Sequence, residues 1–189
     1  INLIPQIQRG LQEEITQPVD FKMPDFFMFD IQPEQLDTLD TVLAERGYSL
    51  SFLSPMINAR LDEVNGVVID DVEETPDEQL MRRRTYNLTY QDQLKNSETL
   101  VDGVTWDGPW SFDSDELPGI SLEENFAERM GLKIGDTMGF DVQSVPISGR
   151  VVNTRKVDWN SFQPNFFVSF QPGVLDPAPK TFVAAISEV

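Results

Sequence analysis

The sequence contains no histidine and no cysteine among its 189 residues. Without cysteine the chain has no disulfide, no thiol nucleophile and no thiolate metal ligand. Without histidine it lacks the usual general base near neutral pH and the commonest ligand of transition metals. A Ser-His-Asp or Cys-His arrangement cannot be built from this chain. We therefore expect no catalytic, cofactor-binding or metal-binding residue, and we predict that the protein is not an enzyme.

Basic residues and long apolar runs are also scarce. The chain has 14 Lys and Arg against 32 Asp and Glu, a formal net charge of −18. Such a surface repels phosphate backbones, so we expect no nucleic-acid partner. No apolar stretch is long enough to be a signal peptide or a membrane span. The phosphate-binding and nucleophile motifs G-x-x-x-x-G-K-[ST], G-x-G-x-x-G and G-x-S-x-G are missing as well.

The first segment has helical periodicity. Ile4, Ile7, Leu11 and Ile15 recur at helical spacing, which predicts an amphipathic helix over residues 2–17. The chain begins with Ile rather than Met, and we interpret it as a piece of a longer protein.

A strand–helix–strand unit is predicted next. The apolar run at 25–31 is typical of a buried strand, and Pro33 suits the first position of a helix. Gly47 stands where a left-handed helix end is expected. Extended patterns follow at 50–53 and 56–64, divided at Pro55. The size of this unit is typical of a β-α-β motif.

The rest of the chain favours strands and turns. Ser121 begins the sequence S-L-E-E, a capping box that predicts a helix ending at Gly131. Because helices separate the early strands and strands dominate later, we predict an α+β fold. Further strands are expected at 85–90, at 138–142 and 145–152 as a hairpin around Gln143-Ser144, at 166–170 and at 181–186, with a turn-rich stretch at 102–119 and a loop at 171–180.

Acidic clusters raise two alternatives. The loop at 70–79 lacks the Asp-x-Asp-x-Asp-Gly spacing of a calcium site, so we interpret it as a solvated loop that Arg82–Arg84 neutralise. A pair of carboxylates can also do acid–base chemistry, although no pair is singled out by its spacing. An acid-only hydrolase needs two carboxylates about 5–10 Å apart in a cleft.

Aromatic residues gather near both ends of the strand-rich region. Most of them suit a core, but the loop Trp159–Asn165 (WNSFQPN) combines aromatic side chains with proline. Loops of this kind often make contacts. The predicted contacts with a partner or substrate are Trp159, Phe162, Gln163, Pro164 and Asn165.

Three stretches together resemble one family. They are 27–39 (FMFDIQPEQLDTL) continuing to 55–66 (PMINARLDEVNG), then 84–90 (RTYNLTY), and finally 121–170, which contains RKVDW and SFQPNFFVSF. They are similar to the periplasmic domain of YbbP-type permeases of ABC transporters, in the wider group that contains MacB, FtsX and the lipoprotein-releasing permeases. The resemblance covers most of the chain from about residue 20.

The resemblance implies a division of the chain. Residues 1–20 would be an amphipathic stalk that continues a membrane helix, and 21–65 a βαβ porter-like lobe. Residues 66–178 would be an inserted, β-rich (Sabre-like) lobe, and 179–189 a return strand. The family pattern continues past this strand into another helix and strand, whereas the chain stops at Val189. We therefore expect the porter-like lobe to be incomplete in this piece.

The resemblance also implies a function. Such a domain lies on the periplasmic side of the bacterial inner membrane, transmits ATP-driven motion and contacts a hydrophobic or lipid-like substrate or a periplasmic partner. A cytoplasmic ATPase subunit and an SGNH-type hydrolase are the expected partners. The alternative is a stand-alone periplasmic module that binds a small apolar ligand, which would need an enclosed apolar pocket.

Overall fold

The computed structural model describes residues 24–69, 84–161 and 163–189. The helix predicted at 2–17, the acidic loop at 70–79, Arg82, Arg83 and Phe162 lie outside these residues. The described part is mixed and mostly β, which confirms the α+β class. Its elements are β1 (Phe26–Ile31), η1 (Pro33–Gln35), α2 (Leu36–Ala44), β2 (Tyr48–Val64), β3 (Val67–Val68), β4 (Thr85–Tyr90), β5 (Glu98–Gly103), β6 (Gly119–Glu123), α4 (Glu124–Met130), β7 (Thr137–Val142), β8 (Val145–Val157), β9 (Val168–Phe170) and β10 (Thr181–Glu188).

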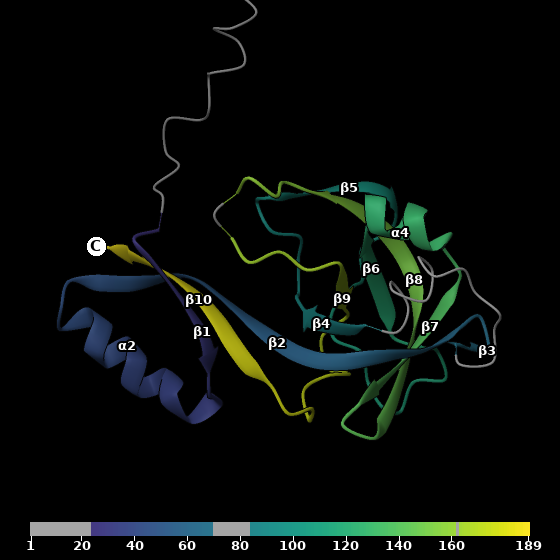
Figure 1. Ribbon diagram of the computed structural model, residues 1–189, viewed down its shortest axis with the longest axis horizontal. Helices are drawn as coiled ribbons and strands as arrows, with labels where there is room; N and C mark the ends of the chain where they lie inside the picture. Colours follow the sequence, from purple (N-terminus) through teal and green to yellow (C-terminus); the bar gives the residue numbers. More distant parts are fainter. Residues whose placement is uncertain (1–23, 70–83, 162) are drawn as a thin grey trace, which may run out of the picture.

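One end of the molecule is a three-strand part, made of β1, β10 and the first half of β2, with α2 beside it (Figure 1). The predicted order strand, helix, strand is confirmed, and Gly47 has the expected positive φ of 77°. However, β1 and β2 are not neighbours, because β10 lies between them and pairs antiparallel with both. A strand from the far end of the chain therefore completes this unit.

The strand β2 is longer than the sequence predicts. It runs unbroken through Pro55, where a break was expected. The reason lies in its pairing, since β10 accompanies β2 as far as Met56 and β4 takes over from Ile57. Pro55 has no N–H to donate, and it falls where the partner strand changes, so little ladder pairing is lost. Its carbonyl oxygen accepts a hydrogen bond of 2.7 Å from the Thr89 hydroxyl.

The other end of the molecule is a barrel part, made of the second half of β2 with β4, β6, β7, β8 and β9 (Figure 1). The pairings form a closed ring, from β2 to β4, β9, β6, β8, β7 and back to β2. A closed ring leaves these strands without a free edge. Its interior is the main core, which includes Ile57, Leu61, Leu88, Ile120, Leu122, Phe126, Phe140, Val151, Val168 and Phe170.

The helix expected after Ser121 begins later than the capping box predicts. Ser121 lies in β6, fully buried, and its hydroxyl donates to the Asn153 side chain. The N-cap of α4 is Glu123, whose carboxylate accepts the Phe126 N–H at 2.7 Å. The predicted capping residue was wrong because strand pairing holds Ser121 in extended backbone. The helix end at Gly131 is confirmed, with φ of 65°.

Candidate functional site

The predicted contact loop connects β8 to β9 and is ordered by its own side chains. The Asp158 carbonyl accepts hydrogen bonds from the Ser161 hydroxyl at 2.6 Å and the Asn165 side-chain amide at 3.2 Å. The Asp158 carboxylate accepts the Asn160 N–H at 3.0 Å. These bonds fold the segment back on itself and fix the direction in which Trp159 leaves the backbone.

Trp159 lies on an aromatic base. Its side chain is 47% exposed, and its ring is tilted against Phe167 with a centroid distance of 5.1 Å. Phe167 in turn stacks on the buried Phe126 at 5.4 Å. The Arg84 guanidinium lies over the rings of Phe167 and Tyr86, at 5.2 and 4.7 Å. A large, half-exposed and well-supported aromatic side chain beside a cation is typical of a contact residue.

A groove opens beside Trp159, with a volume of about 370 Å³. It lies where the three-strand part meets the barrel part, because both contribute to its walls. The sequence-predicted residues Trp159, Pro164 and Asn165 line this groove. The other lining residues are Phe29, Met56 and Val183 from the three-strand part, and Arg84, Thr85, Tyr86, Asn87, Phe166 and Phe167 from the barrel part.

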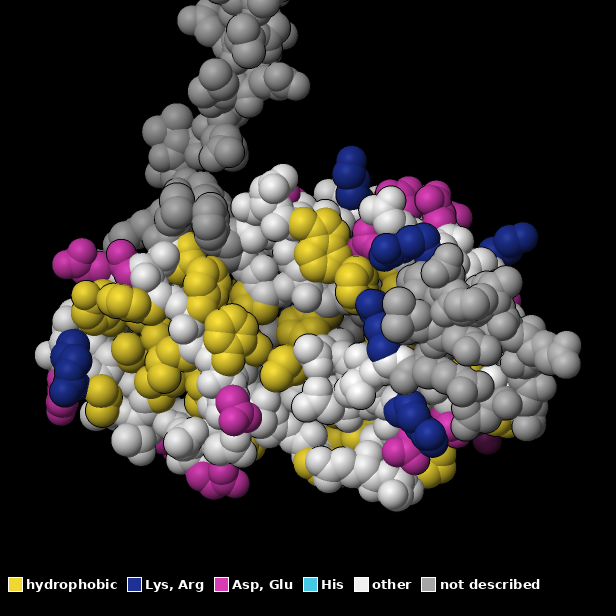
Figure 2. Space-filling view, viewed as in Figure 1, with side chains coloured by type: hydrophobic (Ala, Val, Ile, Leu, Met, Phe, Trp, Pro, Cys, Tyr) yellow, Lys and Arg dark blue, Asp and Glu magenta, His cyan; other side chains and the backbone are white. Residues whose placement is uncertain are grey.

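Apolar surface continues from this groove over the three-strand part. Figure 2 shows hydrophobic side chains gathered on that side of the molecule and across the junction. The exposed hydrophobic residues there are Phe26, Phe27, Met28, Phe29, Val42 and Leu53. A contiguous exposed apolar surface of this kind often marks a site of contact with another molecule.

The groove also holds polar groups. Among the described residues, the buried Asn165 side-chain oxygen finds no hydrogen-bond donor, although the same amide donates to Asp158. A buried acceptor without a donor is unfavourable. Arg84 places a positive charge at the same groove. The remaining predicted residue, Gln163, faces inward and accepts a hydrogen bond from Ser97 at 3.0 Å.

A buried polar network holds this loop from beneath. The Arg155 side chain is fully buried and forms an ion pair with Glu98 at 2.9 Å. Arg155 also donates to the carbonyl oxygens of Ser121 and Phe166, both at 2.7 Å. Lys95 donates to the Pro164 carbonyl at 3.1 Å. Two cations therefore fix the backbone of the contact loop from the barrel side.

The network perturbs the titration of its members. Burial raises the pKa of the Glu98 carboxyl, but the Arg155 charge and hydrogen bonds from Gln91, Arg155 and Lys95 lower it more, so the net pKa lies below its ordinary value. Burial lowers the pKa of the Lys95 ammonium from 10.5 to about 8, with Glu98 opposing the shift and Arg155 adding to it. Burial likewise lowers the pKa of Arg155 against the opposing charge of Glu98.

Sequence reasoning missed this network. Its one visible trace is an alternation in 151–157, where Val151, Asn153, Arg155 and Val157 all point inward. An arginine at an inward position of a strand requires a buried partner. That partner, Glu98, comes from a region in which no strand was expected.

A second, more polar hollow on the other side of Trp159 includes Glu123 and Glu128. The Glu123 carboxylate there is engaged by the Phe126 N–H and by Asn125 at 2.8 Å. Across residues 24–69, 84–161 and 163–189, no group of three or more Asp and Glu side chains is placed to hold a metal ion.

Comparison with known proteins points to one class, the permease subunits of ABC transporters. The chain is 30% identical over 183 residues to the uncharacterized ABC transporter permease YbbP of Escherichia coli (strain K12). The match covers 97% of this chain and 21% of that protein, so the chain spans about a fifth of the relative's length. The similarity supports a permease-related domain. No family model matches the chain.

No helix in the described part of the chain is both long and apolar enough to cross a membrane.

Proposed function

We propose that this chain is a non-catalytic, periplasmic domain of an ABC transporter permease that transmits ATP-driven motion. The observation that carries the proposal is β2, which belongs to both parts of the molecule. Its 17 residues extend over about 55 Å at the usual rise of a strand. Residues 48–56 pair with β10, 57–60 with β4 and 60–64 with β7. A displacement of the three-strand part therefore reaches the barrel part through one hydrogen-bonded strand.

The position of the chain ends supports the same proposal. The Asp25 N–H donates to the Ile186 carbonyl at 2.8 Å, and the Asp25 carboxylate accepts the Glu188 N–H at 2.8 Å. Both ends of the described chain thus leave from the three-strand part, next to each other (Figure 1). This arrangement suits a domain inserted between two membrane helices, with the barrel part held away from the membrane.

The division into lobes belongs to this proposal. Residues 21–65 and 179–189 would form the porter-like lobe, and 66–178 the inserted Sabre-like lobe, with 1–20 as the stalk. The ATPase would be a separate cytoplasmic subunit. The Trp159 groove, defined by its lining residues above, would contact a hydrophobic or lipid-like substrate or a periplasmic partner such as an SGNH-type hydrolase.

Movement can be measured in the full permease with its ATPase, reconstituted in lipid. This domain has no cysteine, so a fluorescent donor can be attached at Glu128→Cys on the exposed face of α4. Energy transfer to a dye in the periplasmic leaflet should change when ATP and vanadate are added. A label pair at Thr38→Cys and Glu128→Cys should keep its distance, since β2 joins the two parts. An unchanged transfer signal with an active ATPase would refute the proposed transmission.

The contact is tested by titrating the domain with a periplasmic SGNH-type hydrolase, the partner that the resemblance implies. We expect Trp159→Ala to weaken binding about tenfold or more, as an anchoring tryptophan does. Val104→Ala is the control, because Val104 is an exposed hydrophobic residue outside the Trp159 groove. Equal effects of the two variants would argue against the groove as the contact.

A second candidate function, a binding module for a small apolar ligand, is favoured by one observation. A separate apolar cavity of about 400 Å³ lies beside the β7–β8 hairpin. Saturable ligand binding without ATP-driven movement in the full permease would favour this second function over the first.

A further inference from the structure

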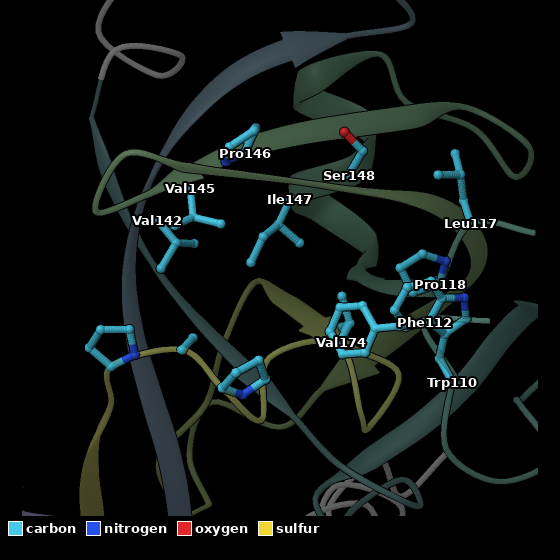
Figure 3. A pocket seen from close by; sticks show the side chains of 13 residues that line it. Trp110, Phe112, Leu117, Pro118, Val142, Val145, Pro146, Ile147, Ser148 and Val174 are labelled. Atoms are coloured by element: carbon cyan, nitrogen blue, oxygen red, sulfur yellow. The ribbon is translucent and has the colours of Figure 1, made fainter. Parts of the chain in front are cut away.

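The apolar cavity lies between three segments that are distant in the sequence. The β7–β8 hairpin forms one wall, the segment 110–118 the second and the loop 174–179 the third. Figure 3 shows Val142, Val145 and Ile147 of the hairpin facing Phe112 and Val174 across the space, while Pro146 and Ser148 point to the other side of the strand. The lining residues are Trp110, Phe112, Leu117, Pro118, Val142, Val145, Pro146, Ile147, Ser148, Val174, Pro177, Ala178 and Pro179.

The lining carries no charge, although the chain has 32 acidic residues. Among the described lining residues, the polar side-chain groups are the Ser148 hydroxyl and the Trp110 indole N–H, and the indole already donates to the Glu116 carbonyl. Water in such a space would find few hydrogen-bond partners, and an apolar group entering it would be transferred out of water favourably. The lining therefore selects for a hydrocarbon group.

The backbone of the walls argues against a peptide as the occupant. Pro118, Pro146, Pro177 and Pro179 have no N–H to donate. The Pro118 carbonyl is already taken by the Arg150 N–H at 2.9 Å. A peptide in this space would bury its own N–H and C=O groups without partners, at a substantial free-energy cost. A hydrocarbon chain has no such groups and incurs no such cost.

The cavity is formed in advance by hydrogen bonds behind its walls. The Trp110 backbone N–H donates to the Pro172 carbonyl at 2.8 Å, and its indole N–H donates to the Glu116 carbonyl at 2.8 Å. The Gln171 side chain donates to the Gly108 carbonyl at 2.9 Å. These bonds fix the 110–118 segment against the loop that carries Val174. A ligand therefore has little ordering of the protein to oppose its binding.

We propose that this cavity binds a single unbranched hydrocarbon chain with an uncharged end. Its volume is at the lower end of the range of about 300–1,000 Å³ for small-molecule sites, which suits one chain rather than a two-chain lipid. Val142 and Val174, both buried, form the deep part of the site, while Phe112 is exposed at the mouth. The Ser148 hydroxyl points away from the space, so the polar end of the chain would stay in solvent at the mouth. The inference goes beyond the proposed contact at the Trp159 groove, because this cavity shares no lining residue with that groove.

The test is a titration of the 189-residue chain with ω-bromododecanol, whose bromine quenches tryptophan fluorescence on contact. We expect saturable quenching, reduced in Trp110→Phe because Trp110 is the tryptophan in the wall. The carboxylate ω-bromododecanoate should bind about tenfold more weakly, since the lining offers no cation to a negative end. This titration needs no ATPase. Its failure would overturn the ligand site but not the proposed motion, and failure of the energy-transfer experiment would overturn the proposed motion but not the ligand site.

Two substitutions locate the site. Val145→Asp places a charge on a lining residue that is 58% exposed, so the fold should tolerate it. We expect it to weaken binding at least tenfold. Val104→Asp is the matched control, because Val104 is 68% exposed and does not line the cavity. Ala178→Leu, which fills part of the space without adding charge, should also weaken binding.

Four results would overturn the inference. The first is quenching that does not saturate, and the second is an equal effect of Val145→Asp and Val104→Asp on the titration. The third is a dimer in sedimentation that Val145→Asp dissociates, which would make a second copy the occupant. The fourth is cosedimentation with phosphatidylcholine vesicles that Val145→Asp abolishes, which would make the cavity a contact with a bilayer surface.

Discussion

The ion pair of Glu98 and Arg155 gives the sharpest prediction about stability. Glu98→Gln keeps the shape of the side chain but removes its charge, so the buried Arg155 guanidinium loses its ion-pair partner and keeps only the weaker attraction of Glu123. Both side chains are essentially inaccessible to solvent, at 1% and 0% exposure. Removing one member of such a pair costs about 3–5 kcal/mol. That is a large share of the roughly 5–15 kcal/mol by which proteins of this kind are stable.

Urea unfolding followed by tryptophan fluorescence measures this cost. Asp62→Asn is the matched control, because Asp62 pairs with Arg60 at 3.1 Å on the exposed surface. That variant should lose less than about 1 kcal/mol. The double variant Glu98→Gln/Arg155→Met should lose less than the sum of the two single variants, since the second change removes the unpaired charge.

The same ion pair also predicts how the stability of the protein changes with pH. The pKa of Glu98 is lowered in the folded protein, so its contribution is fully present above the ordinary value of 4.5 and is lost as the pH falls through the folded value. The stability difference between the wild type and Glu98→Gln should therefore be constant near neutral pH and shrink in acid. Glu98→Gln and Asp62→Asn variants of equal stability, or additive single effects in the double variant, would refute the reasoning.

Two further predictions concern Lys95 and Gly173. The pKa of Lys95 is about 8 in the folded protein, compared with its ordinary value of 10.5. Between these pH values the unfolded chain keeps a proton that the folded protein has released, so the free energy of unfolding relative to Lys95→Met should rise with pH. The expected rise is about 3 kcal/mol, measured by urea unfolding at each pH, and a difference that stays flat or falls would contradict it. Gly173 has a φ of 100°, and a Cβ there would overlap the Trp110 carbonyl oxygen. Gly173→Ala should cost about 2–3 kcal/mol in thermal unfolding, against about 1 kcal/mol for Gly108→Ala, whose Cβ meets open space at a φ of 85°. Equal losses for the two glycines would show that the overlap is relieved at no cost.

Local patterns predicted most of the elements that depend on neighbouring residues. The hairpin around Gln143-Ser144 is confirmed, and these two residues have φ of 50° and 72°, as a tight hairpin turn requires. The strand at 85–90 and the helix end at Gly131 are also confirmed. β5 and β6 were not predicted, because β5 alternates weakly and every residue of β6 is buried.

The candidate site was predicted in part. Trp159, Pro164 and Asn165 line one groove, whereas Gln163 turns inward and Phe162 lies outside the described residues. Whether these residues contact a partner stays a prediction. The structure places Arg84 over two aromatic rings, a contact that the sequence did not predict. Its aromatic neighbour Phe167 is far away in the sequence, so no local pattern reveals the contact. The neutralisation by Arg84 of the acidic loop at 70–79 stays a prediction, because that loop lies outside the described residues.

By itself, the sequence determined the chemistry that this chain lacks and the turns and strands that short-range periodicity encodes. Only the tertiary structure decided that β10 lies between β1 and β2, and that Pro55 falls where β2 changes partners. Only the tertiary structure paired Arg155 with Glu98, 57 residues apart, and formed a partly open apolar cavity between three separate segments. The physical reason is that a side chain's burial and its charge partner depend on long-range strand pairing. Backbone turns, in contrast, depend on residues that are adjacent in the chain.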